Sequence, residues 1–111
     1  GKQMRDFVHV MDVVDALKIC IEADAARVSG EIFNLGCEAT TIEELAKMVL
    51  EEVKKITGKA VSIIYAEERP WEVKVFYYSN EKIQKILGFI PKRTIREGVR
   101  EIMKYYRGRV R

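Results

Sequence analysis

RDFVHVMDVVDA, residues 5–16, points more directly to the fold of this chain than any other stretch. Its first half predicts a short strand at 7–10, and Asp12 is the expected N-cap of the helix that follows. The apolar residues of that helix fall on one face: Val13, Val14, Leu17, Cys20 and Ile21. A strand that leads directly into a helix is the building unit of α/β proteins, so this stretch predicts an α/β fold.

The rest of the chain continues the alternation of strands and helices. EIFNLG at 31–36 and VSIIY at 61–65 each predict a strand, and VKVFYY at 73–78 predicts a shorter extended piece because its valines alternate. The further helices are expected at 41–58, 79–88 and 94–106. The predicted order is β-α-β-α-β-α-α, an α/β fold with at least part of its sheet parallel. We expect residues 1–111 to form a single domain.

Two of these helices begin with a capping box. In this motif a threonine hydroxyl and a glutamate carboxylate three residues later accept each other's free backbone amides. Thr41 with Glu44 opens the helix that ends at Gly58, and Thr94 with Glu97 opens the last helix. The first of the two has the clearest apolar stripe of the chain: Ile42, Leu45, Ala46, Val49, Leu50, Val53 and Ile56.

The composition is that of a soluble globular protein, with 48% hydrophobic and 33% charged residues among 111. Charges interrupt the apolar runs every few residues, so no segment is expected to cross a membrane. Cys20 and Cys37 have neither metal-type spacing nor enough partners for a disulfide framework. We therefore expect reduced cysteines, a cytoplasmic location and no metal site. Only two Asn and two Gln accompany many Lys and Glu, a bias typical of hyperthermophile proteins.

The net charge of +3 indicates little about partners. Much of it lies in RGRVR at 107–111, and the other charges alternate in sign along the predicted helices, as solvated faces do. A small basic nucleic-acid binder, using RGRVR and the Lys54–Lys55 region, is the weakest functional hypothesis. The basic residues are dispersed among acids, and no recognition motif is present.

Arg5 and Arg69 are the binding residues that charge and context single out. Each lies at a predicted strand–loop junction, and a guanidinium offers a planar fork of donors that fits phosphate oxygens. Two such forks from separate loops would form a pyrophosphate clamp. The alternative is that both arginines pair with nearby carboxylates, and spacing alone favours this alternative. The carboxylates concerned are Asp6 for Arg5, and Glu67, Glu68 or Glu72 for Arg69.

The sequence predicts no set of catalytic residues in this chain. His9 is the only histidine, and a backbone partner explains it better than catalysis does. Tyr78 and Lys82 match the Y-x-x-x-K pair of short-chain dehydrogenases, where the pair lies on a long helix. Here Tyr78 ends an extended stretch, so we interpret the match as coincidence. The sequence contains no Gly-rich phosphate loop.

Five short motifs, in order and at suitable intervals, resemble those of a known family. They are RDFVHVMD at 5–12, FNLG at 33–36, TIEEL at 41–45, RPWE at 69–72 and LGFIP at 87–91. Together they resemble the C-terminal, substrate-binding part of the extended short-chain dehydrogenases/reductases. Within that family they resemble the nucleotide-sugar epimerases and dehydratases, the UDP-glucose 4-epimerases most of all. The resemblance covers essentially the whole chain and implies the C-terminal portion of a Rossmann-related fold.

The resemblance also implies roles for single residues. In such enzymes the arginines of the first and fourth motifs hold the diphosphate of the sugar nucleotide, and these are Arg5 and Arg69 here. Glu72 would reach the ribose or nucleotide hydroxyls. The other implied substrate-binding residues are Phe7 near the nucleotide, Phe76 near the sugar, and Asn34 beneath the site. The implied ligand is a nucleotide sugar such as UDP-glucose or UDP-galactose.

The chain departs from the family pattern at two positions. Trp71 replaces the usual glycine between Pro70 and Glu72, where the backbone normally passes close to the ligand. Its ring would either stack on a base or cover surface left open by a missing domain. Ser79 replaces the aspartate that usually caps the following helix, a mild change because serine caps well.

The family's catalytic parts are absent from these 111 residues. Its Gly-rich NAD-binding turn and its Tyr/Lys pair precede this region. We therefore expect a truncated protein that binds no NAD on this chain and does not epimerise or dehydrate a sugar by itself. Open apolar surface would then favour a homo-oligomer or a separate Rossmann-domain chain as partner. The alternatives are a structural or oligomerisation module and one half of a split epimerase.

Overall fold

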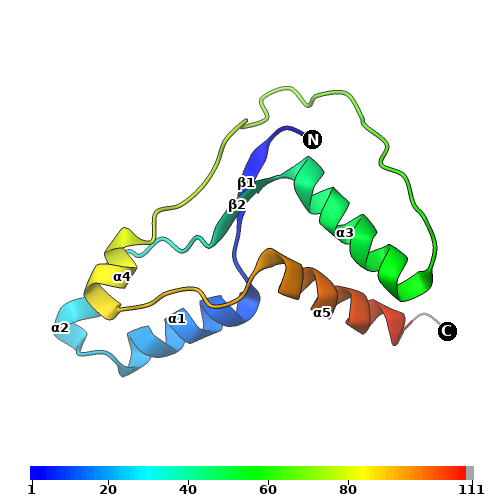
Figure 1. The fold of residues 1–111 in the computed structure, drawn as a ribbon. Coiled ribbons are helices and arrows are strands. Elements are labelled where there is room, and N and C mark those ends of the chain that lie inside the picture. Colours follow the sequence, from blue (N-terminus) through cyan, green and yellow to red (C-terminus); the bar gives the residue numbers. More distant parts are fainter. Residues whose placement is uncertain (110–111) are drawn as a thin grey trace.

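The computed structural model describes residues 1–109 and has the shape of a flat, open frame measuring 53 × 37 × 19 Å (Figure 1). Its radius of gyration is 17.4 Å, whereas a compact domain of this length has roughly 13 Å. The elements are β1 (Met4–Phe7), α1 (Val10–Glu22), α2 (Ala25–Val28), β2 (Glu38–Thr41), α3 (Ile42–Thr57), α4 (Glu81–Leu87) and α5 (Ile95–Arg107). The fold is mixed α/β, as predicted, but its order is β-α-α-β-α-α-α.

The sheet consists of β1 and β2, which lie at the centre of the frame (Figure 1). They pair antiparallel, with Met4 opposite Thr41 and Phe7 opposite Glu38. The predicted parallel pairing is reduced, among the described residues, to one isolated bridge between Met4 and Val75. Two hydrogen bonds make this bridge, from Met4 N to the Lys74 carbonyl at 2.8 Å and from Phe76 N to the Met4 carbonyl at 3.1 Å.

The strands predicted at 31–36 and 61–65 are wrong, since both segments are irregular. The extended piece predicted at 73–78 holds only the bridge to β1. A strand needs a neighbouring backbone for its N–H and C=O groups, and no described strand lies beside either irregular segment. Apolar sequence alone therefore does not make a strand of either segment.

The start of α1 also differs from the prediction. The strand ends at Phe7, and His9 is the N-cap, its Nδ1 accepting a hydrogen bond from Met11 N at 3.1 Å. Asp12 lies inside the first turn and is almost fully buried. Its carboxylate accepts hydrogen bonds from the backbone N–H groups of Lys92 at 3.2 Å and Arg93 at 3.0 Å. Asp12 therefore ties α1 to the 88–94 segment and does not cap it.

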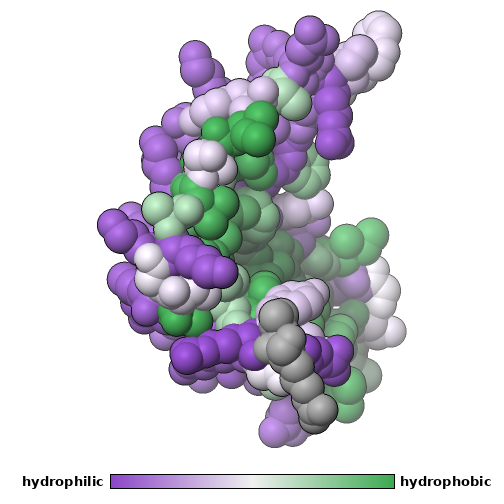
Figure 2. All heavy atoms as spheres, turned by 90° about the vertical axis from the view of Figure 1, so that its right-hand side faces the viewer, coloured by the Kyte–Doolittle hydropathy of each residue, from purple (hydrophilic) through white to green (hydrophobic). Residues whose placement is uncertain are grey.

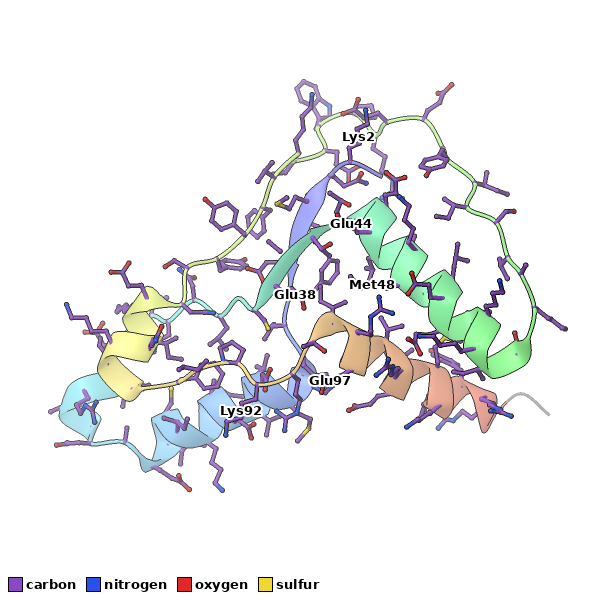
Figure 3. All side chains as sticks on the ribbon, viewed as in Figure 1. Lys2, Glu38, Glu44, Met48, Lys92 and Glu97 are labelled. Carbon is purple, nitrogen blue, oxygen red and sulfur yellow. The ribbon has the colours of Figure 1, made fainter. Side chains whose placement is uncertain are left out.

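Both predicted capping boxes are confirmed. Thr41 with Glu44 begins α3 and Thr94 with Glu97 begins α5, and Figure 3 shows the two glutamates at the starts of their helices. Gly58 ends α3 in the left-handed conformation that glycine adopts easily.

The predicted cap of α4 is displaced by one residue, since Asn80 and not Ser79 is its N-cap. The Asn80 side chain accepts a hydrogen bond from Gly36 N at 2.7 Å and makes no capping bond. The Ser79 hydroxyl still accepts one from Glu81 N at 3.2 Å. Two side chains therefore hold the start of α4: Asn80 binds the backbone of Gly36, and Ser79 binds the first turn of the helix.

The buried apolar residues form one small cluster of Ala16, Ile83 and Phe89 between α1, α4 and the segment after it. Val99 is buried separately, on α5. Large apolar side chains remain exposed over much of the rest. Figure 2 views the side that carries the 58–66 segment and the carboxyl ends of α3 and α5, where apolar side chains gather in a band bordered by polar ones. Much of the apolar surface is therefore uncovered.

Candidate functional site: a charged cleft beside β1

A cleft of about 780 Å³ lies between the amino-terminal residues 1–5, the start of α3 and the segment 63–75. Three of the predicted substrate-binding residues line it: Arg5, Arg69 and Glu72. They come from two regions that are more than sixty residues apart in the sequence. The bridge between Met4 and Val75 brings these regions together, because it fixes the 63–75 segment alongside β1.

Arg5 contacts this segment directly. Its Nη2 lies 3.2 Å from Oε1 of Glu72, and both side chains are about one-quarter exposed, at 27% and 24%. Nη1 donates to the Met4 carbonyl at 2.7 Å, and Gln3 Nε2 donates to the same Glu72 oxygen at 3.4 Å. The guanidinium is therefore held at the cleft wall by the carbonyl of the preceding residue and by the carboxylate of Glu72.

The pairing predicted between Arg5 and Asp6 is wrong. The Asp6 carboxylate turns away from Arg5 and accepts hydrogen bonds from Cys37 N at 2.7 Å and Tyr78 N at 3.1 Å. Asp6 thus joins three separate stretches of backbone on the other side of β1. Arg5 lies on the opposite face, at the cleft, because alternate side chains of a strand point to opposite faces.

Arg69 and Glu72 are the ends of a tight turn. Glu72 N donates to the Arg69 carbonyl at 3.4 Å, Pro70 follows Arg69, and Trp71 has a φ of +68°. Proline at the second position and a left-handed residue at the third define a type II turn. Such a turn keeps its first and last Cα atoms within about 7 Å of each other. The turn formed by the RPWE motif therefore places Arg69 and Glu72 at the same cleft.

The cleft is lined by both cations and carboxylates, and several of the cations have no ion-pair partner among the described residues. Besides Arg5, it is lined by Arg69, Lys2 and Lys74, and none of these three makes an ion pair within residues 1–109. The alternative pairing of Arg69 with Glu67, Glu68 or Glu72 is therefore not observed. Four glutamates line the same cleft: Glu43, Glu67, Glu68 and Glu72. The cleft therefore has no excess of positive charge, and what favours a phosphate is the unpaired guanidinium of Arg69, whose planar fork of donors fits phosphate oxygens.

A glutamate and a tyrosine close the opposite wall of the cleft. The Tyr65 hydroxyl donates to Glu43 Oε1 at 2.9 Å, and Lys47 Nζ lies 3.1 Å from the same oxygen. The hydrogen bond from Lys47, with that from Tyr65, holds the pKa of Glu43 below its usual value. The bond to Glu43 raises the pKa of Tyr65. At neutral pH this pair is therefore a carboxylate and a phenol, and neither is poised as a general base.

The remaining predicted site residues lie away from the cleft. Phe7 ends β1 opposite Glu38, and Phe76 packs its ring edge-on against Tyr78 with centroids 5.0 Å apart. Asn34 is exposed in the irregular 31–37 segment. The cleft thus gathers the charged members of the predicted set and leaves out Phe7, Phe76 and Asn34, whose roles stay predictions.

The side chains that resembled catalytic groups are occupied by other contacts. His9 Nε2 lies 3.1 Å from Glu101 Oε2, and its other ring nitrogen caps α1, so a backbone partner is confirmed. Lys82, on α4, forms an ion pair with Glu31, and its Nζ lies 2.7 Å from Oε2 of that glutamate. Burial raises the pKa of the Cys37 thiol, and nearby carboxylates raise it further. None of these groups is arranged as a nucleophile or a base.

Residues 1–109 contain neither a cluster suited to a metal ion nor a helix suited to a membrane. No three His, Cys, Asp or Glu side chains lie together in a way that would hold a metal ion. No helix in this range has both the length and the apolar character needed to cross a membrane.

Sequence reasoning missed two cations of the cleft. Lys74 lies between Val73 and Val75 in the alternating stretch that bridges to β1, and the alternation alone indicates a polar side chain facing away from the valines. Lys2 precedes β1 and has no sequence feature that would have identified it. Their positions depend on the Met4–Val75 bridge, which no local pattern predicts.

Over nearly its whole length the chain is similar to nucleotide-sugar epimerases and dehydratases. The GDP-mannose 4,6 dehydratase family model matches residues 1–102. UDP-glucose 4-epimerase 2 of Arabidopsis thaliana is 30% identical over 107 residues, which are 95% of this chain and 29% of that protein. dTDP-glucose 4,6-dehydratase 1 of Escherichia coli is 29% identical over 111 residues, which are 96% of this chain and 30% of that protein.

Solved structures show the same likeness. The crystal structure of UDP-glucose 4-epimerase with UDP-glucose from Thermotoga maritima has a TM-score of 0.80 at 32% identity, covering 98% of this chain and 33% of that one. RMD from Pseudomonas aeruginosa, complexed with NADPH, has a TM-score of 0.83 over 98% of this chain and 34% of its own, and at 22% identity it shows the fold alone. The chain thus spans about a third of the length of these relatives. It belongs to the GDP-mannose 4,6 dehydratase family, among the nucleotide-sugar epimerases and dehydratases of the extended short-chain dehydrogenases/reductases.

Proposed function

We propose that the cleft binds the diphosphate of a nucleotide sugar, such as UDP-glucose or UDP-galactose, through Arg5 and Arg69. The observation that carries this proposal is the meeting of Arg5, Arg69 and Glu72 at one cleft from two distant parts of the sequence. Each residue belongs to a motif of the family, and the relative from Thermotoga maritima was solved with UDP-glucose.

The two arginines differ in what they bring to the diphosphate. Arg5 is held by Glu72 and by the Met4 carbonyl, so one edge of its guanidinium is already oriented. Arg69 is exposed and has no ion-pair partner among the described residues, so its fork is available to a ligand. A phosphate oxygen competes with Glu72 for Arg5, and the freed carboxylate then serves as an acceptor for ligand hydroxyls.

On the same proposal, the residues that carry out the chemical reaction lie outside these 111. The 111 residues contain no Gly-rich turn, so they do not fit NAD. We therefore infer that this portion binds and orients the sugar nucleotide and does not by itself transform it. The hydride carrier and the base would come from a nucleotide-binding portion, in the same protein or in a separate one.

A structural or assembly module is the second candidate function, and one observation favours it. One face of α1 is exposed along its whole length, with Val14 at 45%, Leu17 at 58% and Ile21 at 83% exposure. Exposed apolar stripes of this kind mark surfaces that another protein covers. We propose that this face contacts either a second copy of the chain or a nucleotide-binding chain, and this contact is compatible with ligand binding at the cleft.

Calorimetric titration with UDP-glucose tests the binding proposal. We expect saturable binding that weakens ten- to a hundredfold in Arg5→Ala and in Arg69→Ala, because each loses charge-assisted hydrogen bonds of roughly 1.5–3 kcal/mol. Arg107→Ala, near the end of α5 and outside the cleft, is the control and should bind as the parent does. Absence of heat at millimolar UDP-glucose, with the fold intact, would leave the assembly module as the better explanation.

A further inference from the structure

Trp71 is the residue whose presence the fold explains least. It is the only tryptophan of the chain, and its side chain is 99% exposed. Within the described part of the chain it is also the only non-glycine residue with a positive φ, at +68°. A bulky side chain in the left-handed region is strained, and glycine is the residue that a type II turn favours at this place.

This strain has no compensation inside the described residues. The ring buries nothing, and Trp71 takes part in no aromatic pair or cation–π contact among residues 1–109. Backbone strain of this kind persists where a binding function uses the residue. A bound ligand therefore explains the exposed ring of Trp71 better than packing does.

The turn places Trp71 between two residues that line the cleft, while its ring extends into solvent outside the cleft lining. Arg69 is two residues before Trp71 and Glu72 is the next residue, and both line the cleft. In a nucleoside diphosphate a single ribose separates the base from the phosphates. A phosphate on Arg69 therefore leaves the base within reach of the tip of the same four-residue turn.

We propose that Trp71 stacks on the nucleobase of the ligand whose diphosphate lies between Arg5 and Arg69. This inference rests on the proposed function and adds the base-recognising residue to it. An indole offers a flat face, every base has a π-face, and stacking needs no hydrogen-bond readout. Trp71 thus contributes affinity for nucleotides over inorganic diphosphate, with little preference among bases.

The single tryptophan makes the test direct, because all indole fluorescence comes from this position. UDP is expected to quench and shift the emission in a saturable way. Inorganic pyrophosphate is expected to bind by calorimetry without quenching, since it has no base. Quenching by UDP that follows the calorimetric isotherm supports the stacking.

Variants separate the ring from the turn. Trp71→Gly removes the ring and the strain together, so we expect a higher midpoint of thermal unfolding, a UDP affinity roughly ten- to a hundredfold lower and an unchanged pyrophosphate affinity. Trp71→Phe retains a flat ring and is expected to keep most of the UDP affinity. Arg69→Ala is the reference variant, because it should weaken both ligands.

The outcomes distinguish this inference from the proposed function. If UDP binds by calorimetry but neither quenches Trp71 nor loses affinity in Trp71→Gly, the stacking is wrong and the diphosphate site stands. If neither UDP nor pyrophosphate binds, the proposed function and the stacking both fall. An emission that changes with protein concentration in the absence of ligand would show that a second copy covers the ring, and this would also overturn the stacking.

Discussion

Helices α1 and α3 each carry an apolar stripe, but the two stripes differ in how far they are buried. The stripe of α3 is half-buried at every position, and α5 packs beside it. The stripe predicted for α1 is largely exposed, and a different face of that helix, with Ala16 at its centre, packs against the core. A helix that is apolar on more than one side belongs between two layers. The difference teaches that an apolar stripe of the same kind is packed in α3 and exposed in α1, which is why we propose a contact surface on α1.

The two helices are also fixed by different polar contacts. Asp12 fastens α1 to the 88–94 segment, with Arg93 Nη1 2.6 Å from its carboxylate. Glu52, on α3, is buried to 4% exposure and pairs with Arg96 at 3.3 Å and Arg100 at 3.2 Å, both on α5. In a molecule with so little buried apolar surface, these two carboxylates carry an unusual share of the tertiary structure.

The largest expected effect is that of Asp12→Ala. The substitution leaves two backbone N–H groups and one guanidinium without their buried acceptor, and we expect a loss of about 3–5 kcal/mol in the free energy of unfolding. Denaturant titration measures it. Asp15→Ala is the control, because Asp15 shares Arg93 but is far more exposed, at 38%. Equal losses in the two variants would show that α1 is not held by the buried carboxylate.

Glu52→Gln should give the next largest effect, with a characteristic pH dependence. Hydrogen bonds from Lys55 and Arg100 lower the pKa of Glu52 from 4.5 to about 2 in the folded state. The carboxylate therefore stabilises the fold at pH values above 4.5, and this stabilisation is lost as pH falls from 4.5 towards 2. Thermal unfolding across this range should show a smaller acid dependence in the variant than in the parent. Identical pH profiles would contradict the assignment.

A matched pair of leucine substitutions tests the stripes themselves. Leu50→Glu, in the half-buried stripe of α3, should lower the free energy of unfolding by about 1–2 kcal/mol. Leu17→Glu, in the exposed stripe of α1, should change it by less than about 0.5 kcal/mol. Instead, Leu17→Glu should reduce self-association in sedimentation or light scattering. A Leu17→Glu protein that associates like the parent would remove α1 as the contact surface.

The elements that local sequence encodes were predictable. Capping boxes such as Thr41–Glu44 and stop residues such as Gly58 act within one helical turn, so α3 could be placed to within a residue from its sequence. The strand at 31–36 could not be judged in this way. Its apolar sequence indicates a strand, but pairing depends on a neighbouring strand that no local pattern reveals.

The residues of the site show the same distinction between local sequence and long-range pairing. The motifs identified Arg5, Arg69 and Glu72, and the cleft brings these three together. The motifs did not identify Lys2 or Lys74, because these residues reach the cleft only through the bridge between Met4 and Val75. Charged residues next to a turn or strand end are predictable from sequence. Those that long-range pairing brings to a site are not.

Mapping the ligand onto the backbone tests the central claim most directly. Amide chemical shifts recorded by NMR during a titration with UDP-glucose should move for residues 3–5, 42–46 and 63–75, which surround the cleft. The amides of α4, at 81–87, should stay unchanged. Saturable shifts in the first three segments are the predicted result. Shifts confined to α1 or α5, or none at saturating ligand, would contradict the assignment of this cleft as the nucleotide-sugar site.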